Sequence, residues 1–215
     1  MTHGLCSLRD NFTALRRPIN SNLAVALSNP ANIEYEVVRT TLLPGLLKTI
    51  QHNKSASFTK GFRVFEISDV VVQSNTHIVC DTVVGARNLR RVAAVYAGPT
   101  SGFEIVHGLV DRILTLCEVR PEDSYAGNSA RDEEEAFRVV REGWRYEILP
   151  PDANDIDTDL QVYFQGRCAQ VWLTKPNTEG KIRIGSFGIL HPEVLANFSI
   201  QYPASCLELD LEALL

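Results

Sequence analysis

The chain has 215 residues, of which 45% are hydrophobic and 22% are charged. This composition is typical of a globular protein, and a chain of this length can bury a large core without disulfides or a structural metal. Its 21 basic and 26 acidic residues give a formal charge of -5, which argues against a strongly basic nucleic-acid-binding protein. No apolar run reaches the ~18 residues of a membrane span, and the N-terminus has no signal-peptide pattern. We therefore expect no membrane partner.

The five cysteines and five histidines are dispersed along the chain. No C-x-x-C pair is present, and no Cys/His cluster has the spacing of a zinc site. Scattered, unpaired thiols are typical of proteins in a reducing compartment. The sequence therefore predicts a cytoplasmic protein without disulfides and without a metal site.

The N-terminal segment predicts a short strand followed by a helix. Residues 2–7 (THGLCS) are expected to form the strand, and Ser7 is a suitable N-cap for a helix over residues 8–16. Pro18 ends this helix.

The most distinctive helix is predicted over residues 40–50 (TTLLPGLLKTI). Thr41 can cap it, and Pro44 falls in the first turn, where a missing N–H costs little. Its apolar side chains form a wide stripe of Leu42, Leu43, Leu46, Leu47 and Ile50. Gly45 inside a helix costs about 1 kcal/mol relative to alanine, so we expect another group to approach its backbone closely.

The middle of the chain predicts two strands and a second amphipathic helix. Alternation favours a strand over residues 62–72, with a turn or hairpin end over residues 73–82. The sequence GARN at residues 85–88 is expected to be a turn that leads into a strand at residues 92–96. Apolar spacing then predicts a helix over residues 103–117.

The last third predicts mostly strands. They are expected at residues 137–149, 161–164, 168–173, 182–189 and 207–211, with a short helix opened by His191-Pro192-Glu193. Strands that are grouped rather than strictly alternating with helices favour an α+β fold with an antiparallel sheet flanked by helices.

Three groups of residues could carry chemistry. Glu104, His107 and Asp111 share one helix face and could bind a metal or act as acid and base, although a solvated polar face is the favoured interpretation. Gln165-Gly166-Arg167-Cys168 could hold an anion or supply a thiol nucleophile, although a structural turn is favoured. Gly185 and Gly188 indicate a bulge or close contact rather than a phosphate site, and no nucleotide-binding motif is present.

Seven segments taken in order resemble a known family. They are RTTLLPGLLKT (residues 39–49), FEISD (65–69), GARN (85–88), GFEIVHGLVDR (102–112), GRCA (166–169), GILHPEVL (188–195) and LEL (207–209). The resemblance is to the phenylalanyl-tRNA synthetase β subunit of the archaeal and eukaryotic cytosolic type. It is specific to the C-terminal, catalytic-like core domain and covers residues 1–215 as a single domain, in which residues 127–159 look like an acidic insertion.

The resemblance implies a class II aminoacyl-tRNA synthetase-like fold that has lost catalysis. In this family the α subunit aminoacylates tRNA with phenylalanine, using ATP and magnesium, in an (αβ)₂ enzyme. Arg63 and Glu66 approach the class II arginine–glutamate pattern after Phe62, but their spacing puts them on opposite faces of a strand. We therefore expect no catalytic, cofactor-binding or metal-binding residue in this chain, which would scaffold the α subunit and help position tRNA.

The resemblance also places the helix of residues 40–50 at a subunit interface. The interface residues it implies are Thr41, Leu42, Leu43, Gly45, Leu46, Leu47 and Ile50. The alternative interpretation is that this helix is buried wholly within its own domain.

Two further functions remain open from the sequence. A stand-alone class II-like adenylating enzyme would need a pair of arginines in a pocket, and its candidates are Arg63, Arg90, Arg167 and Arg183. An RNA-binding module is the third possibility, against which the net acidity argues.

Overall fold

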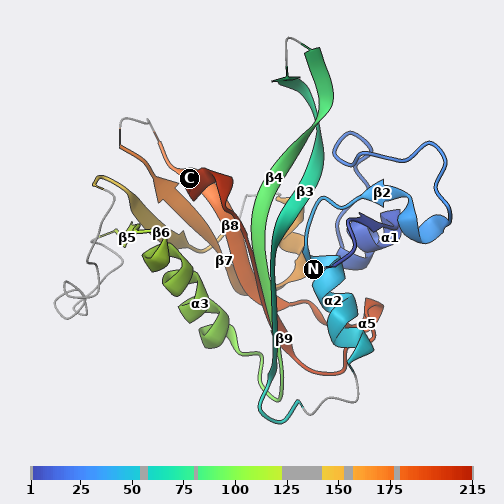
Figure 1. Cartoon of the computed structure of the whole chain (residues 1–215). Coiled ribbons are helices and arrows are strands. Elements are labelled where there is room, and N and C mark those ends of the chain that lie inside the picture. Colours follow the sequence, from blue (N-terminus) through green and yellow to red (C-terminus); the bar gives the residue numbers. More distant parts are fainter. Residues whose placement is uncertain are drawn as a thin grey trace.

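A mixed seven-stranded sheet forms the centre of the computed structural model, which describes residues 2–53, 58–79, 82–122, 142–152, 157–176 and 180–214. The strand order is β3-β4-β9-β8-β7-β6-β5 (Figure 1). The bounds are β3 Phe62–Val79, β4 Thr82–Ala97, β5 Arg120–Pro121, β6 Arg145–Leu149, β7 Tyr163–Thr174, β8 Ile182–Leu190 and β9 Ala204–Asp210. Neighbouring strands are antiparallel except β5 and β6, which run parallel. The fold is α+β as expected, but the expectation of a wholly antiparallel sheet is wrong at this edge.

Helices cover both faces of the sheet. α1 (Leu8–Asn11), α2 (Leu43–His52) and α5 (Pro192–Asn197) lie on one face, and α3 (Phe103–Leu116) lies on the other (Figure 1). We call these the α2 face and the α3 face. A small separate sheet pairs β1 (Leu5–Cys6) with β2 (Val37–Val38).

The alternation of β4 divides its side chains between two apolar cores. Val95 and its neighbours two residues away pack under α2, whereas Val92, Ala94 and Tyr96 pack under α3. Because β4 supplies both cores, the two helical layers are held on one strand of the sheet.

The hairpin of β3 and β4 is longer than the sequence indicates. Its register runs without interruption from Phe62 opposite Ala97 to Ser74 opposite Gly85. The predicted turn at residues 85–88 therefore lies inside β4, because the cross-strand partners continue past these glycine and asparagine residues. The predicted end of the first strand at residue 72 is likewise wrong.

β7 joins two segments that the sequence predicts as separate strands, residues 161–164 and 168–173. Gly166 adopts a left-handed conformation (φ 70°), and the register with β8 shifts between Tyr163 and Cys168. The break in the pattern is therefore a bulge within one strand rather than a turn between two.

The helices follow the sequence more closely. α3 ends one residue before the predicted boundary, and His191 caps α5 by accepting a hydrogen bond from Glu193 N. Ser7 Oγ accepts a hydrogen bond from Asp10 N at the start of α1, as predicted. α1 is shorter than expected, because the chain continues as a 3-10 helix at Thr13–Leu15.

Parts of two predictions lie outside the described residues. The predicted strand at residues 137–149 is described only from residue 142, and β6 occupies its end. Most of the acidic segment at residues 127–159 is also not described. In the part of the chain that is described, no helix is long and apolar enough to cross a membrane.

Candidate functional site

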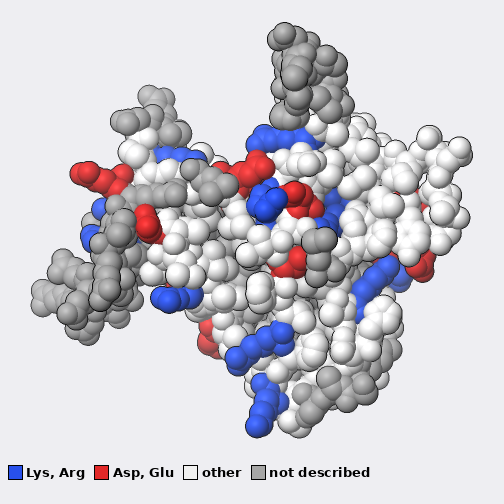
Figure 2. All heavy atoms as spheres, viewed as in Figure 1, with Lys and Arg blue, Asp and Glu red and all other residues white. Residues whose placement is uncertain are grey.

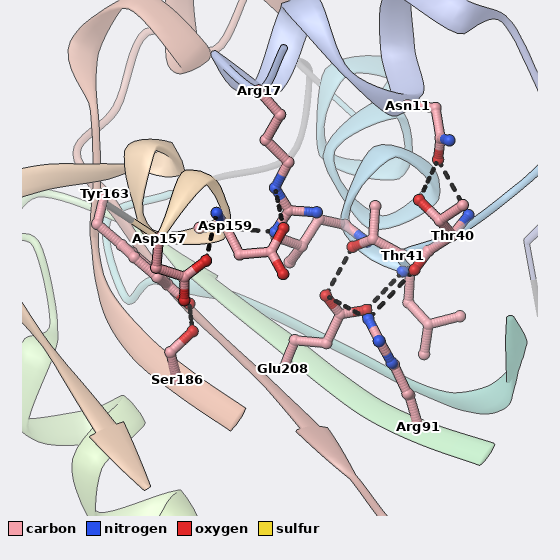
Figure 3. Close-up of polar contacts among 12 residues, drawn as sticks. Asn11, Arg17, Thr40, Thr41, Arg91, Asp157, Asp159, Tyr163, Ser186 and Glu208 are labelled. Carbon is pink, nitrogen blue, oxygen red and sulfur yellow. Dashed lines mark hydrogen bonds and ion pairs between the residues drawn. The ribbon is translucent and has the colours of Figure 1, made fainter. Parts of the chain in front are cut away.

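A buried carboxylate on the α2 face organises the polar side chains there (Figure 3). Glu208 of β9 is only 7% exposed. Its Oε2 accepts a hydrogen bond from Thr41 Oγ1 (2.6 Å), and its Oε1 accepts one from Leu42 N (2.8 Å). These groups form the start of α2, where the helix dipole also stabilises a negative charge. The carboxylate therefore fixes the N-terminus of α2 to the centre of the sheet.

Two further side chains complete this network. Arg91 of β4 lies with Nη1 3.6 Å from the Glu208 carboxylate and donates to the carbonyl of Thr40 (3.1 Å). Asn11 Oδ1 accepts hydrogen bonds from Thr40 N (3.0 Å) and Thr40 Oγ1 (3.2 Å) (Figure 3). The chain just before α2 is thus bound to α1, β4 and β9 together.

A small cavity of about 120 Å³ lies beside this network, lined by Arg17, Arg91, Asp159, Tyr163, Arg183, Ile184, Gly185, Ser186, Glu208, Leu209 and Asp210. Its arginines face carboxylates: Arg17 Nε is 3.3 Å from Asp159 Oδ1, Arg91 faces Glu208, and Arg183 contacts Asp157. Ligand pockets usually measure about 300–1,000 Å³. The cavity is therefore small, and its positive charges are neutralised by the protein.

Tyr163 closes one side of the cavity. Its hydroxyl lies 3.1 Å from Ser186 Oγ (Figure 3). Burial raises the pKa of the Tyr163 phenol well above its ordinary value, so the hydroxyl stays protonated at neutral pH. Burial also raises the pKa of the neighbouring Cys206 thiol to about 12. Neither group supplies a nucleophilic anion.

A second buried ion pair lies under the N-terminal segment. Arg39 Nη1 is 3.2 Å from Glu66 Oε1, and both side chains are less than a tenth exposed. Thr2 donates to Glu66 through its N–H (2.9 Å) and its hydroxyl (2.6 Å), and Arg39 also donates to Ser68 Oγ (2.7 Å). Burial raises the pKa of the Glu66 carboxyl. The Thr2 hydrogen bonds and the Arg39 charge lower this pKa and together outweigh burial, so the pKa lies below its ordinary value.

The predicted interface residues lie mainly in the chain's own core. Thr41, Leu42, Leu43, Leu46, Leu47 and Ile50 are each less than 5% exposed, and the apolar ones pack with β3 and β4. These side chains therefore contribute to the chain's own core, and contact of α2 with a partner stays a prediction. Gly45 is approached closely, as predicted: a Cβ there would lie 2.3 Å from Thr2 Oγ1.

The predicted polar face of α3 makes contacts within the chain. His107 Nε2 lies 3.6 Å from Asp111 Oδ2, and the His107 ring stacks on Phe187. Asp111 also accepts a hydrogen bond from the Tyr146 hydroxyl (3.0 Å), while Glu104 is exposed. Among the described residues, no three His, Cys, Asp or Glu side chains are grouped as metal ligands.

The predicted cysteine and glycine sites are features of strand packing. Burial raises the pKa of the half-buried Cys168 thiol, which lies at the β7 bulge. A Cβ on Gly185 would lie 2.2 Å from the Glu208 carbonyl oxygen, and one on Gly188 would lie 2.6 Å from the Arg167 carbonyl oxygen. Both glycines therefore allow close strand contact, as the sequence indicates.

The four candidate arginines of an adenylating site do not gather in one pocket. Arg63 lies on the α3 face above the Tyr96 ring. Arg90 lies on the same face and forms a bidentate salt bridge with Asp69. Arg167 is exposed in β7, and Arg183 lines the small cavity on the α2 face. Arg63 and Glu66 lie on opposite faces of β3, as their spacing predicts: Arg63 is exposed and Glu66 is buried.

Sequence reasoning missed the Glu208 network. A signal was present, because Glu208 interrupts an apolar strand and two threonines precede the leucines of α2. A buried acid needs donors, and adjacent hydroxyls and free N–H groups at a helix start provide them. The sequence does not say which of its helix starts meets which strand.

We predict that Glu208→Ala lowers the free energy of unfolding by about 2–4 kcal/mol, because Arg91 and the α2 N-terminus lose a buried partner. Glu208→Gln should cost about half as much, since its amide oxygen can still accept from Leu42 N. Urea denaturation followed by circular dichroism measures both. Glu193→Gln, which disrupts an exposed pair, is the control and should cost less than about 1 kcal/mol. Equal losses for Glu208→Ala and the control would contradict the structural role of Glu208.

Gly45→Ala should destabilise the fold, although alanine is the better helix former, because its Cβ would displace Thr2 from Glu66 and Arg39. Gly108→Ala in α3 is the matched control: its Cβ would meet no atom within 4 Å, so it should stabilise by about 0.5–1 kcal/mol. Thermal denaturation compares the two variants. A stabilising Gly45→Ala would show that Thr2 does not hold this position.

Glu66 should make stability depend on pH in the acidic range. Its folded pKa lies below the unfolded value of 4.5, so its carboxylate stabilises the fold above that pH. This contribution is lost as the pH falls through the folded pKa. The difference in unfolding free energy between the wild-type chain and Glu66→Gln should therefore be largest near neutral pH and shrink in acid. A difference that stays constant with pH would contradict this assignment.

Comparison with known proteins identifies the family. Residues 1–211 match the family model described as "Phenylalanyl tRNA synthetase beta chain CLM domain". The chain is 40% identical over 211 residues to the cytoplasmic phenylalanine–tRNA ligase beta subunit of Arabidopsis thaliana, covering 98% of this chain and 30% of the relative. It is 37% identical to the beta subunit of Mus musculus (100% and 30% covered) and 38% identical to that of Saccharomyces cerevisiae (98% and 31%). The chain thus spans about a third of the length of these relatives. By this match it belongs to the phenylalanyl-tRNA synthetase β-chain family, of which it contains the CLM domain.

Proposed function

We propose that this chain is the C-terminal, catalytic-like core of a phenylalanine–tRNA ligase β subunit and that it is itself non-catalytic. It would scaffold the α subunit in an (αβ)₂ enzyme, which attaches phenylalanine to tRNA using ATP and magnesium in the cytoplasm. The family match and the name of the Arabidopsis relative support this assignment. A mixed sheet with helices on both faces and a long hairpin at one edge is compatible with a class II synthetase-like fold.

The observation that carries the non-catalytic role is the neutralised cavity on the α2 face. ATP phosphates need cationic side chains that are available for bidentate contacts. Arg17, Arg91 and Arg183 instead have carboxylate partners within the chain. A nucleotide would have to break these pairs and enlarge a space of about 120 Å³. A scaffold needs neither step.

Pyrophosphate exchange with phenylalanine and ATP tests the catalytic part of the proposal. The chain alone should give no exchange above background, and titration calorimetry should detect no ATP binding. Arg183→Ala, which removes one cation of the cavity, is the control for trace contamination. Exchange caused by a contaminating enzyme would be the same in the wild-type and variant preparations. Exchange that disappears in Arg183→Ala would overturn the non-catalytic role.

Size-exclusion chromatography with light scattering tests the scaffold part. Mixing the chain with the α subunit of the same ligase should give a stable complex with a mass larger than that of either component. A chain that stays separate from the α subunit at micromolar concentration would contradict a scaffold role for this domain.

A further inference from the structure

A short acidic segment borders the small cavity on the α2 face. It consists of residues 157–159, at the start of the 3-10 helix η4 (Thr158–Val162), which Asp157 caps by accepting a hydrogen bond from Asp159 N (2.9 Å). Asp159 Oδ1 lies 3.3 Å from Arg17 Nε, and Asp157 contacts Arg183 (Figure 3). Two acids of one short segment thus contact two arginines of the cavity.

The rest of the chain holds the two arginines in place. Arg183 belongs to β8, whose main chain pairs with β7, and Arg17 N donates to the Phe12 carbonyl (3.0 Å) just after the 3-10 helix of residues 13–15. The apolar contacts of η4 begin only after its acids, because Leu160 and Val162 are the residues that join the core of the α2 face. If the acidic segment moved away, both cations would therefore remain at the cavity.

The ion pairs of the acidic segment are incompletely hydrogen-bonded. Among the described residues, the buried side-chain atoms without a hydrogen bond include Arg17 Nε and Asp157 Oδ2, although each lies within salt-bridge distance of an opposite charge. Arg91 Nε, from a third arginine of the cavity, is another such atom. A buried ion pair offsets its desolvation only when its hydrogen bonds are also made. The arginines thus offer donors that the carboxylates of the chain use only in part.

The other carboxylates of the cavity have partners of their own. Glu208 accepts hydrogen bonds at the start of α2, and Asp210 Oδ1 accepts one from Glu212 N (2.9 Å). Three arginines line the cavity, and without the acidic segment only these two carboxylates oppose them. The lining would then carry a net positive charge, which favours an anion.

The size of the cavity limits which anion can enter. A buried water molecule needs about 10–15 Å³ of cavity, so a space of about 120 Å³ takes a small group with several oxygens and leaves no room for a nucleoside. The planar guanidinium group of arginine matches phosphate oxygens in charge and in hydrogen-bond geometry. A single phosphate group fits these requirements.

We propose that Arg17 and Arg183 form a binding site for one phosphate group, which the carboxylates of the acidic segment occupy in place of the ligand. The segment is an autoinhibitory contact: phosphate and residues 157–159 compete for the same two cations. This inference goes beyond the proposed scaffold function and does not depend on it.

Exposed arginine–carboxylate pairs elsewhere provide a comparison. Figure 2 shows basic and acidic side chains next to one another beside β3 and β4, where Arg90 pairs with Asp69 and Arg87 with Glu212. The side chains of these two arginines are 52% and 50% exposed, whereas that of Arg17 is 11% exposed. Solvated cations gain little from a single anion. Removing their acidic partners therefore tests the effect of charge alone.

Titration calorimetry with inorganic phosphate tests the site. Asp157→Asn/Asp159→Asn removes both negative charges and keeps an amide oxygen at the cap position. This double variant should bind phosphate about tenfold or more tightly than the wild-type chain does. Asp69→Asn/Glu212→Gln is the matched control, because it changes the net charge by the same amount, and it should bind like the wild-type chain. Equal phosphate binding by the two double variants, or none by the first, would overturn the proposal.

Two further ligand tests identify the site and the ligand. Adding Arg17→Gln to the first double variant should abolish phosphate binding, and binding that persists would show that the anion lies elsewhere. AMP should bind no more tightly than inorganic phosphate, because its nucleoside has no room. Much tighter binding of AMP would contradict a site for a single phosphate group.

Hydrogen–deuterium exchange tests competition in the wild-type chain, where no substitution can disturb folding. Leu160 N donates to the Asp157 carbonyl (3.1 Å), so displacement of the acidic segment should speed exchange of the Leu160 amide. A phosphate titration should have this effect, and potassium chloride of equal ionic strength should not. Equal effects of the two salts would contradict competition for a phosphate site. None of these experiments involves the α subunit, so their failure is distinct from failure of the scaffold function.

Discussion

The fixed position of α2 on the sheet depends on one carboxylate. Glu208 reaches from β9 to the first turn of α2, and its two oxygens accept hydrogen bonds from Thr41 and Leu42. The leucine stripe of α2 supplies apolar burial, but apolar contact is not directional and does not by itself set where a helix begins. Arg91 links the same carboxylate to β4, which contributes to both apolar cores. The polar network thus sets the geometry in which the apolar layers pack.

The two surfaces with arginines differ in what surrounds the cations. On the α2 face, carboxylates of the chain approach Arg17, Arg91 and Arg183, so the polar cavity is balanced internally. On the α3 face, Arg63 and Arg112 lie beside exposed apolar side chains. Paired buried charges are costly to separate, whereas solvated ones can exchange water for a ligand at little cost. A charged ligand would therefore meet a smaller electrostatic cost at the α3 face than in the polar cavity.

The periodicity of the sequence correctly predicted those elements whose formation depends on local interactions. The helical spacing of residues 103–117 and the His191-Pro192-Glu193 start gave α3 and α5 with small errors, and composition and element order gave an α+β fold. Turn-forming residues misled at residues 85–88 and at Gly166, because pairing with a neighbouring strand can extend through such residues. The parallel pairing of β5 and β6 involves two residues of each strand, too few to leave a pattern.

The candidate site was less accessible to sequence reasoning. Thr41 and Glu208 are separated by 167 positions, so no local pattern joins them. The stripe of α2 was recognised, but a wide apolar face looks the same whether a neighbouring strand or another subunit covers it. The exposure of Phe65 could not be anticipated either, since alternation gives two faces of a strand without saying which one is covered.

The length of the β3–β4 hairpin has a mechanical consequence. β4 has β9 beside it only from Arg91 to Ala97, so the remainder of the ribbon has β3 as its strand neighbour. Two contacts tie this ribbon to the rest of the chain: Gln73 N of β3 donates to the Leu23 carbonyl, and Arg87 of β4 contacts Glu212. Gln73 and Arg87 are almost opposite each other in the register of the two strands. Two-stranded ribbons are more strongly twisted than wide sheets. Twisting of the described residues beyond these contacts would act along β4 on Arg91, which binds the Thr40 carbonyl just before α2.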